Sequence, residues 1–165
     1  GDSYFLPFVN QFFVGGNNSL RAFRARGVGP GTYSLEGQST ASKFLATNTG
    51  DIKIEFNTEL RYKLSSLLST ALFVDAGNVW MYKDPYIYDE GAVFSKSFLK
   101  EMAVGGGIGF RFDFSIFIFR IDVATPFRKP WLDEPERWVF DQINLKSKDW
   151  RRENIIWNFA VGLPF

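Results

Sequence analysis

Apolar and polar residues alternate over long stretches of this sequence, and this alternation constrains the fold more than any other feature. In residues 51–62 (DIKIEFNTELRY), the even positions are mostly apolar and the odd positions carry charged or amide side chains. A period of two is the geometry of a β-strand, whose successive side chains point to opposite faces of the sheet. The segments with this pattern are 51–62, 70–80, 99–113, 115–126 and 154–165. They predict an all-β fold, an antiparallel meander of five long strands, or six if residues 3–14 form another.

The segments are long, and the links between them alternate in length. Strands of about ten residues are longer than most strands of soluble sheets and match strands that cross a bilayer at a tilt. The links 63–69 and 113–115 are short, whereas 81–98 and 127–153 are long. Outer-membrane barrels have short periplasmic turns and long extracellular loops. The pattern therefore favours part of a transmembrane β-barrel. A soluble sandwich or ligand-binding barrel stays open, because a period of two does not say which face is wet.

The composition excludes several classes of function. The sequence of 165 residues contains no Cys and no His, so it has no thiol nucleophile, no thiolate metal site and no imidazole base. Lys and Arg (19) nearly balance Asp and Glu (18), which leaves a net charge of +1. This balance provides no electrostatic basis for binding nucleic acid. We expect no enzyme activity, no metal or other cofactor, and no nucleic-acid partner.

A run of glycines in the third segment invites a nucleotide-binding interpretation. Gly105, Gly107 and Gly109 stand in AVGGGIGF, on the polar side of the alternation. A dinucleotide-binding loop joins a strand to a helix, whereas these residues lie within a predicted strand. We expect them instead to thin the inner wall, so that the sheet can bend or a loop can pack on it.

The stretch GGNNSLRAFRARGVGPG (15–31) combines three arginines with glycines. GGNNSLRAF, followed by a strand with Glu55 and then by FVDAGNVW, resembles the barrel of the outer-membrane assembly-factor superfamily. This superfamily includes BamA-like and TamA-like surface antigens and the two-partner secretion transporters. In these proteins a long loop folds back into the lumen of a barrel of about sixteen strands and carries an Arg-containing motif. The matching residues here are Gly16, Leu20, Arg21, Ala22 and Phe23, with Ala22 where the family usually has Gly.

The resemblance implies that the chain is the carboxy-terminal part of such a barrel. Residues 15–50 would form the lumen-folding loop, and residues 51–165 would form five barrel strands. Arg21 would cross the lumen to Glu55 and Asp75, because a planar guanidinium can bridge two carboxylates. Read without the family, Arg21 is a solvated loop cation. RAFRARGVGPGTY looks more like a Bacteroidetes-type member than a proteobacterial one.

The end of the chain, NFAVGLPF, has apolar residues at alternate positions and a terminal aromatic residue. Phe159, Val161, Leu163 and Phe165 look like the final-strand signal of outer-membrane barrels, although an ordinary closing strand has the same pattern. The resemblance implies a bacterial outer-membrane protein that inserts or exports β-rich client proteins without nucleotide. Its partners would be outer-membrane lipid, client barrels and other assembly subunits.

Alternatives are a two-partner secretion transporter, a passive pore or a soluble ligand-binding barrel. The isolated chain would have two open sheet edges and an apolar outer face, so we expect it to self-associate.

Overall fold

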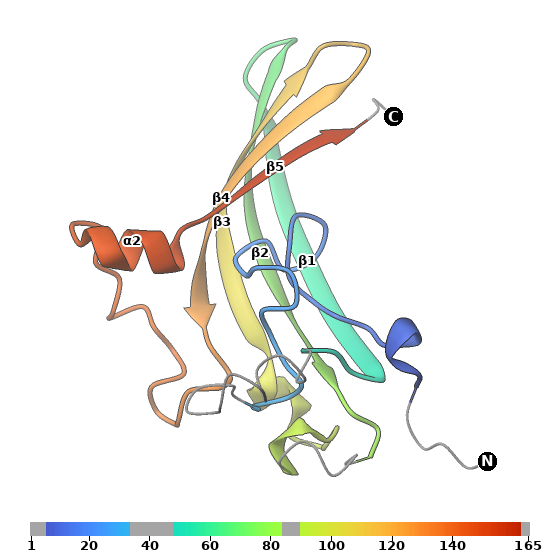
Figure 1. Ribbon diagram of the computed structural model, residues 1–165. Coiled ribbons are helices and arrows are strands. Elements are labelled where there is room, and N and C mark those ends of the chain that lie inside the picture. Colours follow the sequence, from blue (N-terminus) through green and yellow to red (C-terminus); the bar gives the residue numbers. More distant parts are fainter. Residues whose placement is uncertain (1–5, 34–47, 84–89, 163–165) are drawn as a thin grey trace.

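A single five-stranded sheet dominates the computed structural model, which describes residues 6–33, 48–83 and 90–162 (Figure 1). Each strand pairs antiparallel with the next along the chain. The strands are β1 (Ile52–Lys63), β2 (Leu68–Trp80), β3 (Ala103–Asp113), β4 (Ile118–Arg128) and β5 (Ile156–Gly162). The predicted all-β meander of five strands is therefore confirmed. A sixth strand does not form in residues 6–14, which hold the 3-10 helix η1 (Phe8–Asn10) and one isolated bridge between Phe12 and Gly50.

The strand boundaries differ from the alternation pattern by up to four residues, and β4 begins at Ile118 rather than at residue 115. The third strand was expected from residue 99, but the 3-10 helix η3 (Phe98–Glu101) occupies its start, because the buried Glu101 side chain accepts a hydrogen bond from Trp80 Nε1. The helix α2 (Lys148–Asn154) likewise delays β5, and the short helix η2 (Glu90–Ala92) lies in the other long link. Among the described residues, no helix is long and apolar enough to cross a membrane.

The two faces of the sheet have opposite environments. On the apolar face, Phe56, Leu60 and Leu72 are 58%, 71% and 58% exposed. On the charged face, Asp75 and Asp122 are fully buried. The segment 14–33 lies across this second face, beside β1 and β2 in Figure 1. These three apolar side chains therefore point outward without covering, which is the arrangement of a membrane barrel wall and the reverse of a soluble sandwich.

The hydrophobic core lies between the 14–33 segment and the inner face. Both the segment and the strands supply large and small side chains. The core residues are Val14, Leu20, Ala22, Phe23 and Val28 from the segment, and Phe73, Val79, Ala103 and Ala124 from the strands. Because burial of one large apolar side chain contributes about 1.5–3 kcal/mol, this contact holds the segment against the wall.

Candidate functional site: an arginine latch on the inner wall

The tip of the 14–33 segment is a closed turn that glycine makes possible. Gly15 and Gly16 have φ angles of 101° and 93°, which L side chains rarely adopt. A Cβ atom at Gly15 would lie 2.0 Å from the carbonyl oxygen of Arg24. The Gly16 amide donates a hydrogen bond to the Phe23 carbonyl (2.9 Å), and this bond closes the turn around Arg21.

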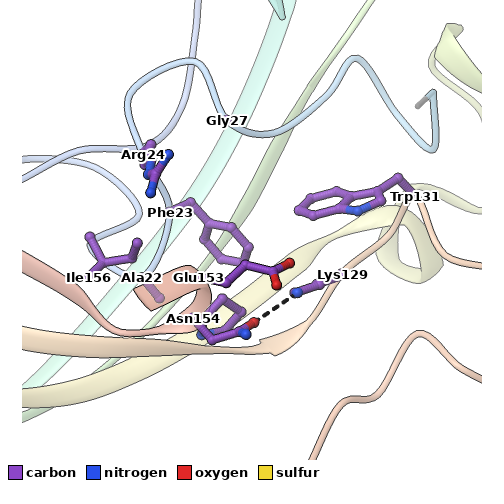
Figure 2. A pocket seen from close by; sticks show the side chains of 10 residues that line it. Ala22, Phe23, Arg24, Gly27, Lys129, Trp131, Glu153, Asn154 and Ile156 are labelled. Carbon is purple, nitrogen blue, oxygen red and sulfur yellow. Dashed lines mark hydrogen bonds between the residues drawn. The ribbon is translucent and has the colours of Figure 1, made fainter. Parts of the chain in front are cut away.

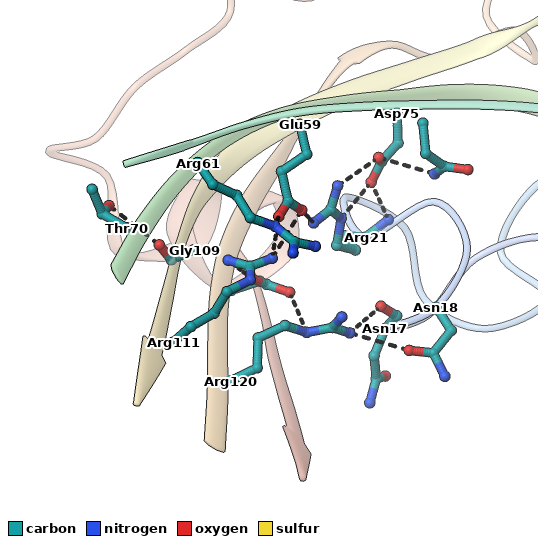
Figure 3. Close-up of polar contacts among 12 residues, drawn as sticks. Asn17, Asn18, Arg21, Glu59, Arg61, Thr70, Asp75, Gly109, Arg111 and Arg120 are labelled. Atoms are coloured by element: carbon teal, nitrogen blue, oxygen red, sulfur yellow. Dashed lines mark hydrogen bonds and ion pairs between the residues drawn. The ribbon is translucent and has the colours of Figure 1, made fainter. Parts of the chain in front are cut away.

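Arg21 binds two carboxylates of the inner wall (Figure 3). Its Nε and Nη2 atoms donate to Asp75 Oδ2 and Oδ1 at 2.8 and 2.9 Å, and its Nη1 donates to Glu59 Oε2 at 2.6 Å. The Arg21 amide also donates to Asp75 Oδ2 (3.0 Å). The guanidinium carbon lies 3.5 Å from the centre of the Phe73 ring. Bidentate arginine–carboxylate pairs are among the strong hydrogen bonds in proteins, and they also fix the relative orientation of the two side chains.

The charges around Arg21 keep it protonated. Burial alone would lower the pKa of its guanidinium, but the hydrogen bonds and negative charges of Asp75 and Glu59 outweigh this cost and raise the pKa above its usual value. Asp75 is satisfied on its other side by Asn57, whose Nδ2 donates to Oδ1 at 3.0 Å. Asn57 Nδ2 also donates to the Ser19 carbonyl, so one side chain of β1 joins the turn to the carboxylate.

The sequence-based pairing of Arg21 with Glu55 is wrong in this structure, because Glu59 takes that place. Glu55 instead lies 2.6 Å from Lys53 Nζ. In the sheet register Asp75 faces Asn57, so Glu55 and Glu59 lie two positions to either side of it on the same strand face. Phe73, on which the guanidinium rests, faces Glu59. The position of the Phe73 ring therefore directs the Arg21 guanidinium toward Glu59 rather than toward Glu55.

A wider charge network surrounds the latch. Arg111 Nη2 and Arg61 Nε lie 2.8 and 2.5 Å from Glu59 Oε1. Asp122 lies 3.0 Å from Arg120 Nε and 3.8 Å from Arg111 Nη1. We did not predict these residues, or Asn57 and Glu59, as site residues. The available signal was their position on the charged side of the alternation, which they share with Glu55 and Asp75.

The last strands hold the same turn from the other side. Asn158 of β5 donates from Nδ2 to the Arg21 carbonyl (2.8 Å), and Asn17 Nδ2 donates to the Phe159 carbonyl (3.0 Å). Arg120 of β4 donates to the Asn17 carbonyl and to Asn18 Oδ1. The turn thus joins β1 and β2 to β4 and β5 across the inner face.

Ala22, which replaces the usual Gly of the motif, fits without backbone strain. Among the described residues, the non-glycine positions with positive φ are Arg26 and Ser115, so Ala22 has an ordinary conformation. Its side chain is buried against Gly105, where an added Cβ would lie 2.2 Å from the Ala22 Cβ. Gly105 therefore thins the wall where the loop packs, as the sequence predicted.

Phe23 lines an open pocket at the start of β5 (Figure 2). Its ring meets Trp131 edge to face, with the ring centres 6.1 Å apart. Lys129 Nζ donates to Asn154 Oδ1 at 2.9 Å in the wall of this pocket. The contacts tie the motif to the long link that precedes β5.

Of the proposed final-strand signal, Phe159 and Val161 lie in β5 on the outer face and are 57% and 69% exposed. Leu163 and Phe165 lie outside the described residues. Within the described ranges, no group of carboxylates is placed to hold a metal ion.

An exposed apolar face, a charged inner face and a buried loop on that inner face define a membrane β-barrel wall. A family model described as the Omp85 superfamily domain matches residues 1–144. The chain therefore belongs to the Omp85 superfamily, whose members are bacterial outer-membrane proteins. The family consists of protein insertion and translocation factors that work with the lipid membrane and with client proteins. No solved structure matches the chain.

Proposed function

We propose that this chain is the carboxy-terminal part of an Omp85 barrel that inserts β-rich client proteins into the outer membrane without nucleotide. In this proposal residues 15–50 are the lumen-folding loop, and residues 51–165 carry the five barrel strands. The observation that supports it is the bidentate contact of Arg21 with Asp75, joined by Glu59, in a buried position on the inner wall. A passive pore or a ligand-binding barrel has no need of such a contact.

The latch acts by fixing geometry rather than by adding much stability. Burying two charges costs nearly as much solvation energy as their attraction returns, so the main gain is a single defined arrangement. Arg21 contacts β1 and β2 through its side chain and β5 through its carbonyl. The loop therefore sets the position of the last strand relative to the wall.

In this proposal, client strands bind to the free edge of the last strand. β5 has seven residues and pairs with β4 along one side. An open strand edge offers backbone hydrogen bonds that a client strand can use as a template. Exchange of one strand pairing for another needs no nucleotide hydrolysis, which is consistent with an insertion factor that has no nucleotide site. Phe159 and Val161 on the outer side of β5, with Leu163 and Phe165 after them, would form the final-strand signal of the barrel itself.

Matched substitutions in β1 test this function in cells. Glu59→Gln and Glu55→Gln make the same chemical change on the same strand face, but Glu59 is the residue that contacts Arg21. We expect Arg21→Ala and Glu59→Gln to lower the amount of client barrels assembled in the outer membrane, and Glu55→Gln to leave it unchanged. Arg21→Lys should rescue poorly, because an ammonium lacks the two-pronged geometry.

Quantitative blots of folded clients, normalised to the level of the protein itself, provide the measurement. If Arg21→Ala assembles clients normally at normal levels, the latch has no role in insertion. If clients are unaffected and one secreted substrate accumulates inside the cell, the protein is a two-partner secretion transporter. The Bacteroidetes-type assignment stays a prediction.

A further inference from the structure

The hydrogen-bond pattern of the last three strands shows which backbone groups of β5 face its free edge. At the β3–β4 turn the Phe114 amide donates to the Phe117 carbonyl at 3.0 Å, and the β3–β4 register stays unbroken over the length that β5 covers. Successive residues of a strand point their backbone groups to opposite sides, so odd-numbered residues of β4 bond to β3 and even-numbered ones bond to β5. Even residues of β4 face even residues of β5. The odd residues of β5, which are Trp157, Phe159 and Val161, therefore present their amides and carbonyls to the free edge.

One of these edge groups is already occupied by the 14–33 segment. Asn17 Nδ2 donates a hydrogen bond of 3.0 Å to the carbonyl of Phe159, the middle residue of β5. A strand that pairs with a free edge needs the same carbonyl as an acceptor for one of its own amides. The side-chain amide of Asn17 thus takes the position that a backbone amide of an added strand would take. Pairing along the whole of β5 therefore requires that Asn17 leave the edge.

Contacts with β4 and β5 hold Asn17 at this edge (Figure 3). Arg120 Nη2 of β4 donates to the Asn17 carbonyl, and Arg120 Nε lies 3.0 Å from the fully buried Asp122. On the same turn, the Arg21 carbonyl accepts a hydrogen bond of 2.8 Å from Asn158 Nδ2 of β5. Asn17 itself is exposed, so its bond to the strand edge is accessible to a competing amide. Asn17 is therefore anchored by the turn that carries Arg21, while its bond to β5 can exchange.

On the basis of the proposed insertion function, we propose that Asn17 is an edge cap that stops a client strand from pairing beyond Phe159. The partner is an extended β-strand, because a free edge presents backbone amides and carbonyls in the spacing of a strand. β5 ends beside the short β3–β4 turn, and the short turns of outer-membrane barrels face the periplasm. A client strand that arrives from the periplasm therefore meets Val161 first, then the capped Phe159, and last Trp157. Release of Asn17 lets the pairing extend to Trp157, so the turn that carries the latch controls how far a client strand is held.

Photocrosslinking at two edge positions tests the proposal. The full-length protein in lipid vesicles carries the photoreactive residue p-benzoylphenylalanine in place of either Val161 or Trp157, which are 69% and 59% exposed. The probe is a tagged, unfolded small outer-membrane barrel of the same organism, added to these vesicles. We expect the crosslink yield at position 161 to exceed that at position 157 about fivefold, the factor that one hydrogen bond of ordinary net strength supplies. Equal yields at the two positions would overturn the proposal.

A substitution with a matched control identifies the capping group. Asn17→Asp removes the cap at nearly constant shape, because a carboxylate cannot donate to the Phe159 carbonyl. It should raise the yield at position 157 about fivefold and leave the yield at position 161 unchanged. Asn144→Asp makes the same chemical change in the link before β5, where the side-chain oxygen accepts from two backbone amides, as a carboxylate also can. This control should leave both yields unchanged.

The possible outcomes separate the cap from the insertion function. If position 161 captures the client and Asn17→Asp leaves the yield at position 157 unchanged, the cap is refuted while insertion at the β5 edge stands. If neither position captures the client, both insertion at this edge and the cap are refuted. The comparison of the two positions in the protein with Asn17 intact decides the question even if Asn17→Asp fails to fold.

Discussion

The outer and inner faces of the sheet contrast in exposure and in chemistry. Outside, Leu60 and Val161 are 71% and 69% exposed, whereas inside, Asp75 and Asp122 are fully buried. In a soluble protein these environments would be exchanged, because apolar groups gain most from leaving water and buried charges require partners. The difference shows that the apolar face is built for contact with lipid, and that the charged face is covered by the chain's own loop.

The 14–33 segment covers the charged face and completes an ion-pair network there. Three of its carboxylates have at least one guanidinium within ion-pair distance. These are Asp75 with Arg21, Glu59 with Arg21, Arg61 and Arg111, and Asp122 with Arg111 and Arg120. Charges in such a network tolerate burial only when all partners are in place. The outer face has no comparable requirement, so substitutions on the two faces should have very different consequences.

The largest expected effect concerns the isolated chain. With an exposed apolar face and open sheet edges, residues 1–165 alone should self-associate or require detergent. Light scattering without detergent measures this directly. A monodisperse, soluble monomer would mean that the apolar side chains pack inside one chain, and the contrast between the faces would be lost.

Removal of one inner carboxylate should destabilise the barrel far more than truncation of an outer side chain. Asp75→Ala leaves Arg21 buried without its main partner, and we expect a loss of about 3–5 kcal/mol in the free energy of unfolding. Leu72, which precedes Phe73 on β2 and points outward, is 58% exposed. Leu72→Ala should cost under about 1.5 kcal/mol, because the loss is limited to partial burial. Urea unfolding of the full-length protein in lipid vesicles, followed by tryptophan fluorescence, compares the two variants. Equal losses would refute the distinction.

A smaller loss of unfolding free energy is expected where Ala22 of the loop packs against Gly105 of β3. Gly105→Ala places a methyl 2.2 Å from the Ala22 Cβ, and overpacking of this kind costs about 1–3 kcal/mol. Gly162→Ala is the control, because no atom lies within 4 Å of its added Cβ. Combining Gly105→Ala with Ala22→Gly should recover part of the loss, since the two methyl groups then no longer collide. A double-mutant cycle of unfolding free energies measures the coupling, and simple additivity would show that the two sites do not touch.

Alternation predicted the strands well because it follows from backbone geometry. Every second residue of a strand faces the same side, so 51–62 and 115–126 showed both their faces in the sequence. The strand beginnings were less predictable. Two residues of β2, Trp80 and Asn78, donate hydrogen bonds to Glu101 at the end of η3. The local sequence pattern does not predict contacts between residues so far apart.

The latch was predicted in part. Arg21 and Asp75 follow from the motif and from the charged face, and the structure places them in contact. The choice between Glu55 and Glu59 could not follow from the pattern, since both carboxylates have the same spacing from Asn57 and point to the same side. The hydrogen bond from Asn158 to the Arg21 carbonyl joins residues 137 positions apart in the chain, so the local sequence pattern could not predict it either.

The sequence by itself determined the strands, the chemical difference between their faces and the presence of a glycine-rich, arginine-bearing loop, because these depend on neighbouring residues. The tertiary structure decided which face is covered, which carboxylate completes the latch and where the last long link folds. Those outcomes depend on how the loop packs on Phe73 and Gly105, and on how α2 packs beside Ile108. Such contacts join residues far apart in the chain, so their geometry exists only once the sheet has formed.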